Sequence, residues 1–345
     1  MDVNTMRFEQ AVASLAPKLR ERLREIPQSA KSTAFEVRLR VGSPLSICCG
    51  GQTWFVDNQS RLHNKPMRAV IVDQEEISES VISMCSYSVH SHQEEMKSGF
   101  ISLIGGHRAG ICGTAVTSNG IITSVRDITS VNLRIARDLE GVADGLIQAV
   151  FSNGPCGLLV AGTPSSGKTT VLRDLARQLG GGGLGRFVKV AVIDERCEIG
   201  AVYDGIPQNN LGACCDLLSG YPKGEGIQIA LRTLSPQVIL CDEIGSSAEV
   251  KGMMEGFNCG VKMVASVHAA APEELLKRPQ IRALLEAGAF EKIAMLSGEE
   301  HPGVVTRTME TRELFADYGD IFRSNMFLDD WELDGVKTIK TGVSN

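Results

Sequence analysis

The stretch from residue 162 to residue 169 reads Gly-Thr-Pro-Ser-Ser-Gly-Lys-Thr, and it constrains the fold of this chain more than any other. An apolar run, residues 157–161, precedes it, and a run with helical spacing of apolar residues begins at Val171. In a strand, loop and helix of this kind, successive backbone N–H groups and the positive end of the helix point at one anion. The sequence therefore predicts a phosphate-binding Walker A loop between a strand and a helix.

Two residues of this loop have individual predicted tasks. The Lys168 ammonium would reach the β- and γ-phosphates of a nucleotide, and the Thr169 hydroxyl would complete the ligand shell of Mg²⁺. An ordinary glycine-rich turn is the alternative in a chain with 36 glycines, but the flanking strand and helix disfavour it. The residues expected to bind the nucleotide are Gly162, Thr163, Pro164, Ser165, Ser166, Gly167, Lys168, Thr169 and Thr170.

Composition narrows the class of protein. Of the 345 residues, 43% are hydrophobic and 22% are charged, as in a soluble globular protein long enough for two domains. The net charge of −6 disfavours broad binding of nucleic acid or anionic lipid, although it leaves room for a local basic face. Several of the ten cysteines fall in apolar strands, which favours a reducing compartment over a disulfide framework. No apolar run approaches the ~20 residues that span a bilayer. We therefore expect a cytoplasmic protein that meets the cytoplasmic membrane only through partners.

The hydrophobic pattern changes near residue 138 and predicts two main domains. Residues 1–138 combine amphipathic helices with short alternating strands, such as residues 36–41, and predict an α+β domain built around two short β units. Residues 139–303 alternate strand and helix, which is typical of a parallel sheet covered on both faces. Its expected strands are 157–161, 188–194, 237–242 and 261–266. Residues 304–345 carry several aromatic residues and are expected to form a short, strand-rich appendage.

Acidic residues follow two of the expected core strands. Asp242 and Glu243 end the apolar run 237–241, in the form of a Walker B motif. Asp242 would hold Mg²⁺ through water, and Glu243 would orient or deprotonate the attacking water. Asp194 and Glu195 end the strand 188–194, and the carboxyl ends of parallel strands share one edge where ligands bind. The alternative for this second pair is a structural salt bridge to Arg196.

His268 ends the strand that follows the Walker B motif. If that strand lies between the Walker A and Walker B strands, His268 would sit near the γ-phosphate as a donor or sensor. A purely structural histidine is the alternative.

Together these segments resemble the four motifs of the secretion-type traffic ATPases of type II and type IV systems. Those segments are the Walker A loop, the acidic residues 194–198, residues 231–243 and residues 266–269. The chain resembles the stage III sporulation protein AA family more closely, over roughly residues 30–300, through residues 36–44, 106–113, 206–208, 221–226 and 242–245. It departs at Cys214 and Ser246, where members of that family tend to carry arginine.

The resemblance implies a RecA-like core and an ATP- and Mg²⁺-dependent hydrolase. It implies a self-assembling, hexameric motor that energises a channel of membrane-embedded partners between mother cell and forespore. In such rings an arginine of a neighbouring subunit reaches the nucleotide; the candidates are Arg126, Arg134 and Arg137, with Arg232 as a second contact. Two alternatives remain open: a nucleic-acid-associated ATPase with a basic channel, and a nucleotide-dependent scaffold with little turnover. Because the net charge is −6, we expect no nucleic acid among the partners.

Overall fold

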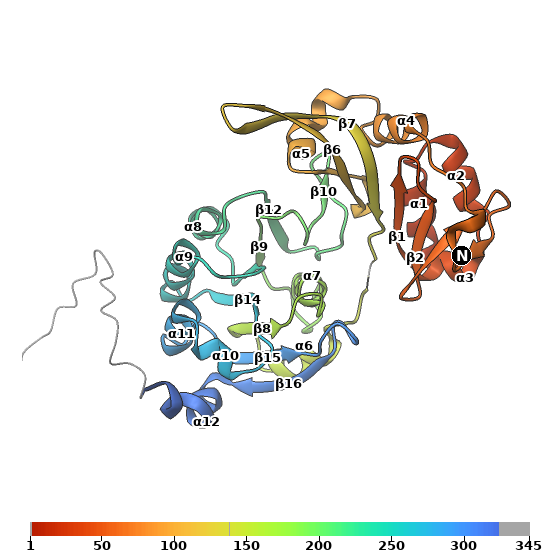
Figure 1. Cartoon of the computed structure of the whole chain (residues 1–345). Coiled ribbons are helices and arrows are strands. Elements are labelled where there is room, and N and C mark those ends of the chain that lie inside the picture. Colours follow the sequence, from red (N-terminus) through yellow and green to blue (C-terminus); the bar gives the residue numbers. More distant parts are fainter. Residues whose placement is uncertain (1, 138, 324–345) are drawn as a thin grey trace, which may run out of the picture.

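The computed structural model describes residues 2–137 and 139–323, and it contains two large sheets (Figure 1). The N-terminal sheet is antiparallel, with strand order β4-β3-β2-β1-β7-β6-β5. The second is mostly parallel, with strand order β12-β9-β13-β14-β8-β15-β16. The predicted arrangement, an α/β core with a parallel sheet preceded by an α+β domain, is therefore confirmed.

Five α-helices accompany the N-terminal sheet within the described residues: α1 (Val3–Val12), α2 (Pro17–Arg24), α3 (Gln28–Thr33), α4 (Gln74–Met84) and α5 (Gln93–Lys97). The Asp2 carboxylate caps α1 by accepting from the Thr5 backbone N–H at 3.0 Å. Pro17 starts α2, as expected of a residue with fixed φ and no N–H. Asp73 and Glu76 form a capping box at the start of α4.

The N-terminal strands are β1 (Ala34–Arg40), β2 (Ser46–Cys49), β3 (Gln52–Val56), β4 (Leu62–His63), β5 (Phe100–Ser102), β6 (Arg108–Ser118) and β7 (Ile121–Arg134). Single 3₁₀ turns lie at Pro66–Arg68 (η1), Val89–His92 (η2) and Ile104–Gly106 (η3). Val37 and Leu39 of β1 face the core as the alternation predicts, whereas Val41 lies beyond the strand and is exposed.

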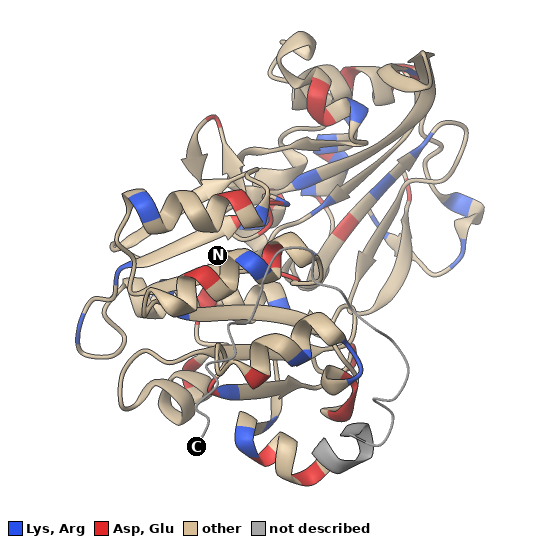
Figure 2. Cartoon of the chain, turned by 90° about the vertical axis from the view of Figure 1, so that its left-hand side faces the viewer, with Lys and Arg blue, Asp and Glu red and all other residues tan. Residues whose placement is uncertain are grey.

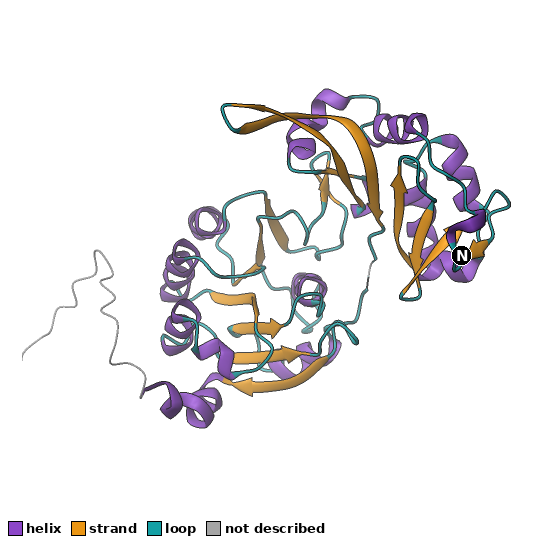
Figure 3. Ribbon diagram, in the orientation of Figure 1, coloured by secondary structure: helices purple, strands orange, loops and turns teal. Residues whose placement is uncertain are grey.

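The expectation of two short β units in this domain was wrong. β1 pairs with β7, from Glu36 opposite Arg134 to Arg40 opposite Ser130, and so joins both groups of strands into one sheet. This pairing joins residues about 90 positions apart, which local periodicity does not reveal. A hairpin turn at Asn119-Gly120 joins β6 to β7: both residues have positive φ, and the two strands extend as a long ribbon beyond the sheet (Figure 3).

The core strands are β8 (Leu158–Gly162), β9 (Val190–Asp194), β12 (Cys215–Ser219), β13 (Val238–Cys241), β14 (Lys262–His268), β15 (Lys292–Leu296) and β16 (Val305–Glu310). The four expected strands are present, while β12 and β15 were not predicted. A two-stranded hairpin, β10 (Val202–Tyr203) with β11 (Ile206–Pro207), projects from the loop after β9.

Helices cover both faces of the core sheet (Figure 1). The elements packed on one face are α6 (Asp144–Phe151) and α7 (Lys168–Gly180). The other face carries α8 (Lys223–Thr233), α9 (Ser247–Asn258), α10 (Glu273–Leu276) and α11 (Pro279–Glu286), with α12 (Thr311–Arg323) at the edge. None of the helices in residues 2–137 and 139–323 is long and apolar enough to cross a membrane.

The segment after residue 303 begins as part of the core. β16 pairs antiparallel with β15, from Lys292 opposite Glu310 to Leu296 opposite Val305, and becomes an edge strand of the core sheet. A helix, α12, follows directly. The described part of the expected strand-rich appendage is therefore one strand that extends the core and one helix. Phe327 and Trp331, which contributed to that expectation, lie outside the described residues.

Candidate active site

The predicted Walker A loop connects β8 to α7. Gly167 stands at the N-terminus of α7 with φ 86°, a conformation that favours glycine. A Cβ at Gly167 would lie 2.5 Å from the Gly303 nitrogen, and one at Gly162 would lie 2.4 Å from Ser166 Oγ. The Gly303 N–H also donates to the Ser166 carbonyl at 2.8 Å. Both loop glycines are thus required, and the β15–β16 turn packs directly on the loop.

Lys168 is buried at the base of the loop. Its Nζ donates to the Gly162 carbonyl at 3.1 Å and to the Thr163 carbonyl at 2.8 Å, and it contacts His268 Nδ1 at 3.1 Å. Burial lowers the pKa of the ammonium, and the negative charges of Glu243 and Asp242 oppose that shift. A cation held among loop carbonyls at the N-terminus of a helix is suited to an anionic ligand.

Thr169 and Asp242 lie together, as a shared Mg²⁺ site requires. Thr169 Oγ1 donates to Asp242 Oδ2 at 2.5 Å, and Ser266 Oγ donates to Asp242 Oδ1. A hydroxyl and a carboxylate are hard oxygen ligands that suit Mg²⁺, which otherwise keeps waters and substrate phosphates. The described residues contain no group of three acidic, His or Cys side chains that could hold a metal alone. The residues present therefore fit a metal that arrives with a phosphate.

Glu243 and His268 face each other across neighbouring strands. Strand β14 lies between β13 and β8, the condition under which His268 was expected near the phosphates. His268 Nε2 contacts Glu243 Oε1 at 2.8 Å, while its Nδ1 faces Lys168. Because Lys168 can only donate, Nδ1 must accept and Nε2 must carry the proton donated to Glu243. Arg196 pairs with the other oxygen of the same carboxylate.

The second acidic strand end does not join this group. Asp194 is buried and accepts the backbone N–H groups of Glu198 at 2.9 Å and Gly200 at 2.8 Å. Glu195 pairs with Lys223 at 3.0 Å and does not line the cleft. The alternative for this pair, a structural salt bridge to Arg196, is also not formed, because Arg196 pairs with Glu243 instead. The local sequence contains no signal that tells these partners apart.

Arg232, predicted as a second contact from a neighbouring subunit, lies away from the Walker A loop of its own chain. It is exposed in the last turn of α8, close before β13 begins. The Walker A loop follows the opposite, carboxyl end of its parallel strand β8. Within one chain, Arg232 and Lys168 are therefore at opposite edges of the sheet. A contact between Arg232 and the nucleotide of a neighbouring subunit therefore stays a prediction.

The cleft above the loop has a volume of about 770 Å³ and is lined by both domains. Arg134 and Arg137 line it from the N-terminal domain of the same chain, whereas Arg126 lies on the exposed ribbon beside Asp127 at 3.5 Å. Arg137 Nη2 donates to the Ala34 carbonyl at 3.1 Å, and its buried Nε has no partner among the described residues. Burial lowers the pKa of Arg137.

Two charged residues of the cleft, Arg108 and Arg173, were given no role from the sequence, and a third, Glu198, was named only as part of the acidic segment 194–198. Arg173 of α7 donates to the Glu198 carbonyl at 2.8 Å and the Ile199 carbonyl at 3.1 Å. Arg108 lies 3.5 Å from Glu198 Oε1. Burial raises the pKa of Glu198, while Arg108 opposes the shift. Arg173 could have been predicted from the sequence, because it lies about one and a half helical turns after Lys168 on the same expected helix.

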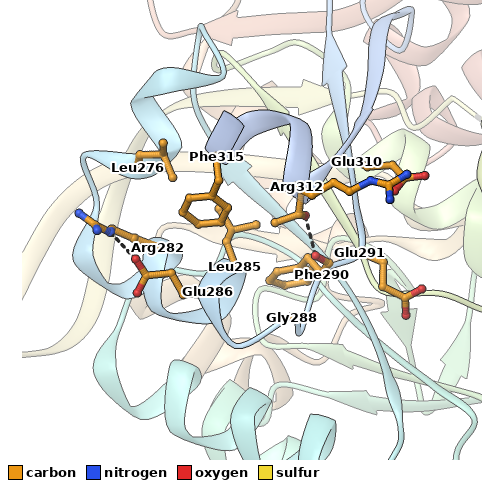
Figure 4. A pocket seen from close by; sticks show the side chains of 11 residues that line it. Leu276, Arg282, Leu285, Glu286, Gly288, Phe290, Glu291, Glu310, Arg312 and Phe315 are labelled. Atoms are coloured by element: carbon orange, nitrogen blue, oxygen red, sulfur yellow. Dashed lines mark hydrogen bonds and ion pairs between the residues drawn. The ribbon is translucent and has the colours of Figure 1, made fainter. Parts of the chain in front are cut away.

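A separate groove of about 710 Å³ lies where α11, β15 and α12 meet (Figure 4). Leu285, Phe290 and Phe315 form its apolar part, and Arg282 pairs with Glu286 at 2.7 Å. This groove is at the opposite end of β15 from the Walker A loop, and no glycine-rich loop borders it. Its chemistry does not resemble that of a phosphate site.

A family model described as "Sporulation stage III, protein AA" matches residues 5–314. The chain belongs to this family. It is 34% identical over 299 residues to the stage III sporulation protein AA of Bacillus subtilis (strain 168), covering 86% of this chain and 93% of that protein. The family resemblance derived from the sequence is thus confirmed.

Solved structures of an ATPase and of a pilus retraction motor share the fold. The ATPase DotB of Legionella pneumophila aligns with a TM-score of 0.55 and 15% identity, over 84% of each chain. The ADP-bound pilus retraction motor PilT aligns with a TM-score of 0.52 and 14% identity, over 85% of each chain. At these identities the likeness shows the fold alone. It confirms a RecA-like core behind an N-terminal antiparallel-sheet domain.

Proposed function

We propose that this protein hydrolyses ATP with Mg²⁺ and works as a hexameric motor for a transport channel in sporulation. One observation supports the hydrolase most directly: Lys168, Thr169, Asp242, Glu243 and His268 meet at one edge of the sheet, beside the Walker A loop. The fold shared with ATPases of secretion systems and with the retraction motor PilT supports ATP and a motor role.

Binding of the nucleotide follows from the charges around the loop. The Lys168 ammonium now donates to loop carbonyls, and a phosphate oxygen in the loop would compete for the same protons. Thr169 and Asp242 would hold Mg²⁺, which when bound neutralises charge between the β- and γ-phosphates. Arg134 and Arg137 add positive charge from the N-terminal side of the cleft. The N-terminal domain thus contributes to the site within its own chain.

Hydrolysis requires a general base whose side chain is fixed in position and can still accept a proton from water. Glu243 can accept the proton of an attacking water, and the Nε2–H of His268 orients its carboxylate. The Arg196 guanidinium covers the other carboxylate oxygen and must move for a water to reach it. Arg196 is more than half exposed, so this movement exposes no buried charge.

The test of this proposal measures both the rate of ATP hydrolysis and the size of the oligomer. Phosphate release from Mg²⁺-ATP is measured alongside light scattering with and without a non-hydrolysable ATP analogue. A nucleotide-dependent hexamer with steady turnover supports the motor. A persistent monomer contradicts the ring, and tight binding with negligible turnover indicates the scaffold instead.

A nucleic-acid-associated ATPase is the remaining alternative from the sequence. Figure 2 shows basic and acidic residues interspersed over the cartoon of the chain, and the chain as a whole is acidic. Neither observation favours a basic channel. Salt-dependent stimulation of turnover by single-stranded nucleic acid would reverse this preference.

A further inference from the structure

Lys223 is a buried lysine at the start of α8 that the scheme above does not use. Its side chain is 6% exposed, and it does not line the nucleotide cleft. The ammonium donates to the Glu243 carbonyl at 2.9 Å and lies 3.0 Å from Glu195 Oε2 and 3.3 Å from Glu249 Oε1. One buried cation therefore ties together the loops after β9 and β13 and the first turn of α9.

The Glu243 backbone needs such a restraint. Its φ is 44°, in the left-handed region that residues other than glycine rarely adopt. Such a conformation persists where the surrounding structure over-determines it. Both backbone polar groups of Glu243 are hydrogen-bonded: the N–H donates to Ser266 Oγ at 2.9 Å, and the carbonyl accepts from Lys223. The direction in which the Glu243 carboxylate leaves the backbone thus depends on two buried side chains.

The charge of Lys223 is maintained inside the protein. Burial alone would lower its pKa, but hydrogen bonding to Glu195 and the negative charges of Glu195 and Glu249 raise it overall. Glu249 is itself anchored, since its Oε2 accepts the N–H groups of Gly245 at 2.7 Å and Ser246 at 2.9 Å. Lys223 therefore remains an ammonium with defined partners, and it keeps the Glu195 carboxylate outside the cleft.

We propose that Lys223 is a positioning residue for hydrolysis: it fixes the backbone of Glu243 so that the carboxylate faces the cleft, and it holds Glu195 away from the reacting groups. This inference rests on the proposed ATPase function. Lys223 acts through Glu243 and does not itself line the nucleotide cleft. Its loss should leave ground-state nucleotide binding intact and impair the step that requires Glu243.

The test compares Lys223→Met, Lys223→Arg and a matched control, Lys262→Met. Lys262 also pairs with a glutamate, Glu291 at 2.6 Å, but at the other end of the sheet. Three quantities are measured on the full chain: affinity for Mg²⁺-ADP, affinity for Mg²⁺-ADP with aluminium fluoride, and kcat. The fluoride complex mimics the phosphoryl group under attack, so its binding reports the position of Glu243 without requiring turnover.

For Lys223→Met we expect Mg²⁺-ADP affinity within about threefold of wild type and a loss of about 100-fold in kcat and in fluoride-complex affinity, because small misplacements of a catalytic group have effects of this size. Lys223→Arg restores most of both losses, since a guanidinium can reach the same three oxygens. Lys262→Met matches wild type. Unchanged kcat and fluoride-complex affinity in Lys223→Met, or an equal loss of both affinities, would overturn the inference.

Two outcomes need separate treatment. If Lys223→Met does not fold, the double variant Lys223→Met, Glu249→Gln removes one charge of each sign and is measured in its place, with the same expectation. If the wild-type protein releases no phosphate, the proposed function fails. The fluoride-complex affinities of the Lys223 variants then still test whether Lys223 positions Glu243. If the wild-type protein does not prefer the fluoride complex over ADP, the inference fails as well.

Discussion

At the scale of single residues, the candidate site is a chain of contacts from Lys168 through His268 to Glu243. The phosphate-binding cation and the proposed base are thus coupled before any nucleotide is present. A phosphate that attracts Lys168 would change the contacts of His268 Nδ1 and, through the ring, those of Glu243. Lys168 and Glu243 have separable tasks, phosphate binding and proton transfer, and each leads to its own prediction.

Lys168→Ala removes the ammonium that faces the bound phosphates. We expect the affinity for Mg²⁺-ATP to fall by at least about 100-fold, because a charge-assisted contact of this kind contributes on the order of 3 kcal/mol. Titration of wild type and variant with a fluorescent ATP analogue measures this loss of affinity. Unimpaired binding would show that the loop is an ordinary glycine-rich turn. Lys292→Ala, at the opposite end of the sheet, is the control and should bind normally.

Glu243→Gln retains the shape of the side chain and removes the base. Nucleotide affinity should remain within about threefold, while turnover falls by about 100-fold or more, the range attributed to a general base. Phosphate release under saturating ATP gives the answer. Undiminished turnover would transfer the role of base to another carboxylate, of which Glu195 is the first candidate once Lys223 releases it.

At the scale of elements, the turn between β15 and β16 acts as part of the nucleotide loop. The Gly303 N–H donates to Ser166, and Gly303 has φ 85°. A Cβ there would lie 2.8 Å from Val142 Cγ1. The edge strand that follows therefore positions the turn against the Walker A loop, although the two segments are more than 130 residues apart.

Gly303→Ala should displace this turn and weaken Mg²⁺-ADP binding by about 30-fold, because the substitution combines an unfavourable φ with a steric clash, each costing about 1 kcal/mol. Gly298→Ala is the matched control in the same turn, since its Cβ would meet only Thr163 Oγ1 at 3.9 Å. Isothermal titration of both variants measures the difference. Equal affinities would show that the turn does not support the loop.

Local sequence patterns predicted the elements of this protein better than the contacts between them. The apolar runs that form β8, β9, β13 and β14 were long enough to be recognised, and the order of polar residues after them located Lys168, Asp242 and Glu243. β12 and β15 were missed because short apolar segments give a weak signal. The partners of Glu195 and the position of Arg232 depend on tertiary packing and helix direction, which local periodicity does not contain.

At the scale of the whole molecule, the cleft is closed on one side by the N-terminal domain, and the chain segment between the domains is held by a buried histidine. His107 Nδ1 accepts the Ala136 N–H at 2.9 Å, close to Arg137 at the cleft. The side chain is 2% exposed, and its Nε2 has no partner among the described residues. Burial, and to a lesser extent the charge of Arg7, lowers the pKa of His107 to about 4.

This histidine should make stability depend on pH in a defined window. Between its ordinary pKa of 6.5 and its folded pKa of about 4, the unfolded chain binds a proton that the folded protein does not. Its contribution is therefore complete above pH 6.5 and is lost as the pH falls, by about 2 kcal/mol between pH 7 and pH 5. Urea unfolding followed by circular dichroism measures this loss.

His107→Gln removes the titrating ring but retains an oxygen that can accept the Ala136 N–H. We expect the free energy of unfolding of this variant to change by about 2 kcal/mol less than that of wild type between pH 7 and pH 5. His90→Gln, at an exposed position, should retain the wild-type pH dependence. If His107→Gln and wild type lose the same stability over this range, the His107 ring does not have a lowered pKa in the folded protein.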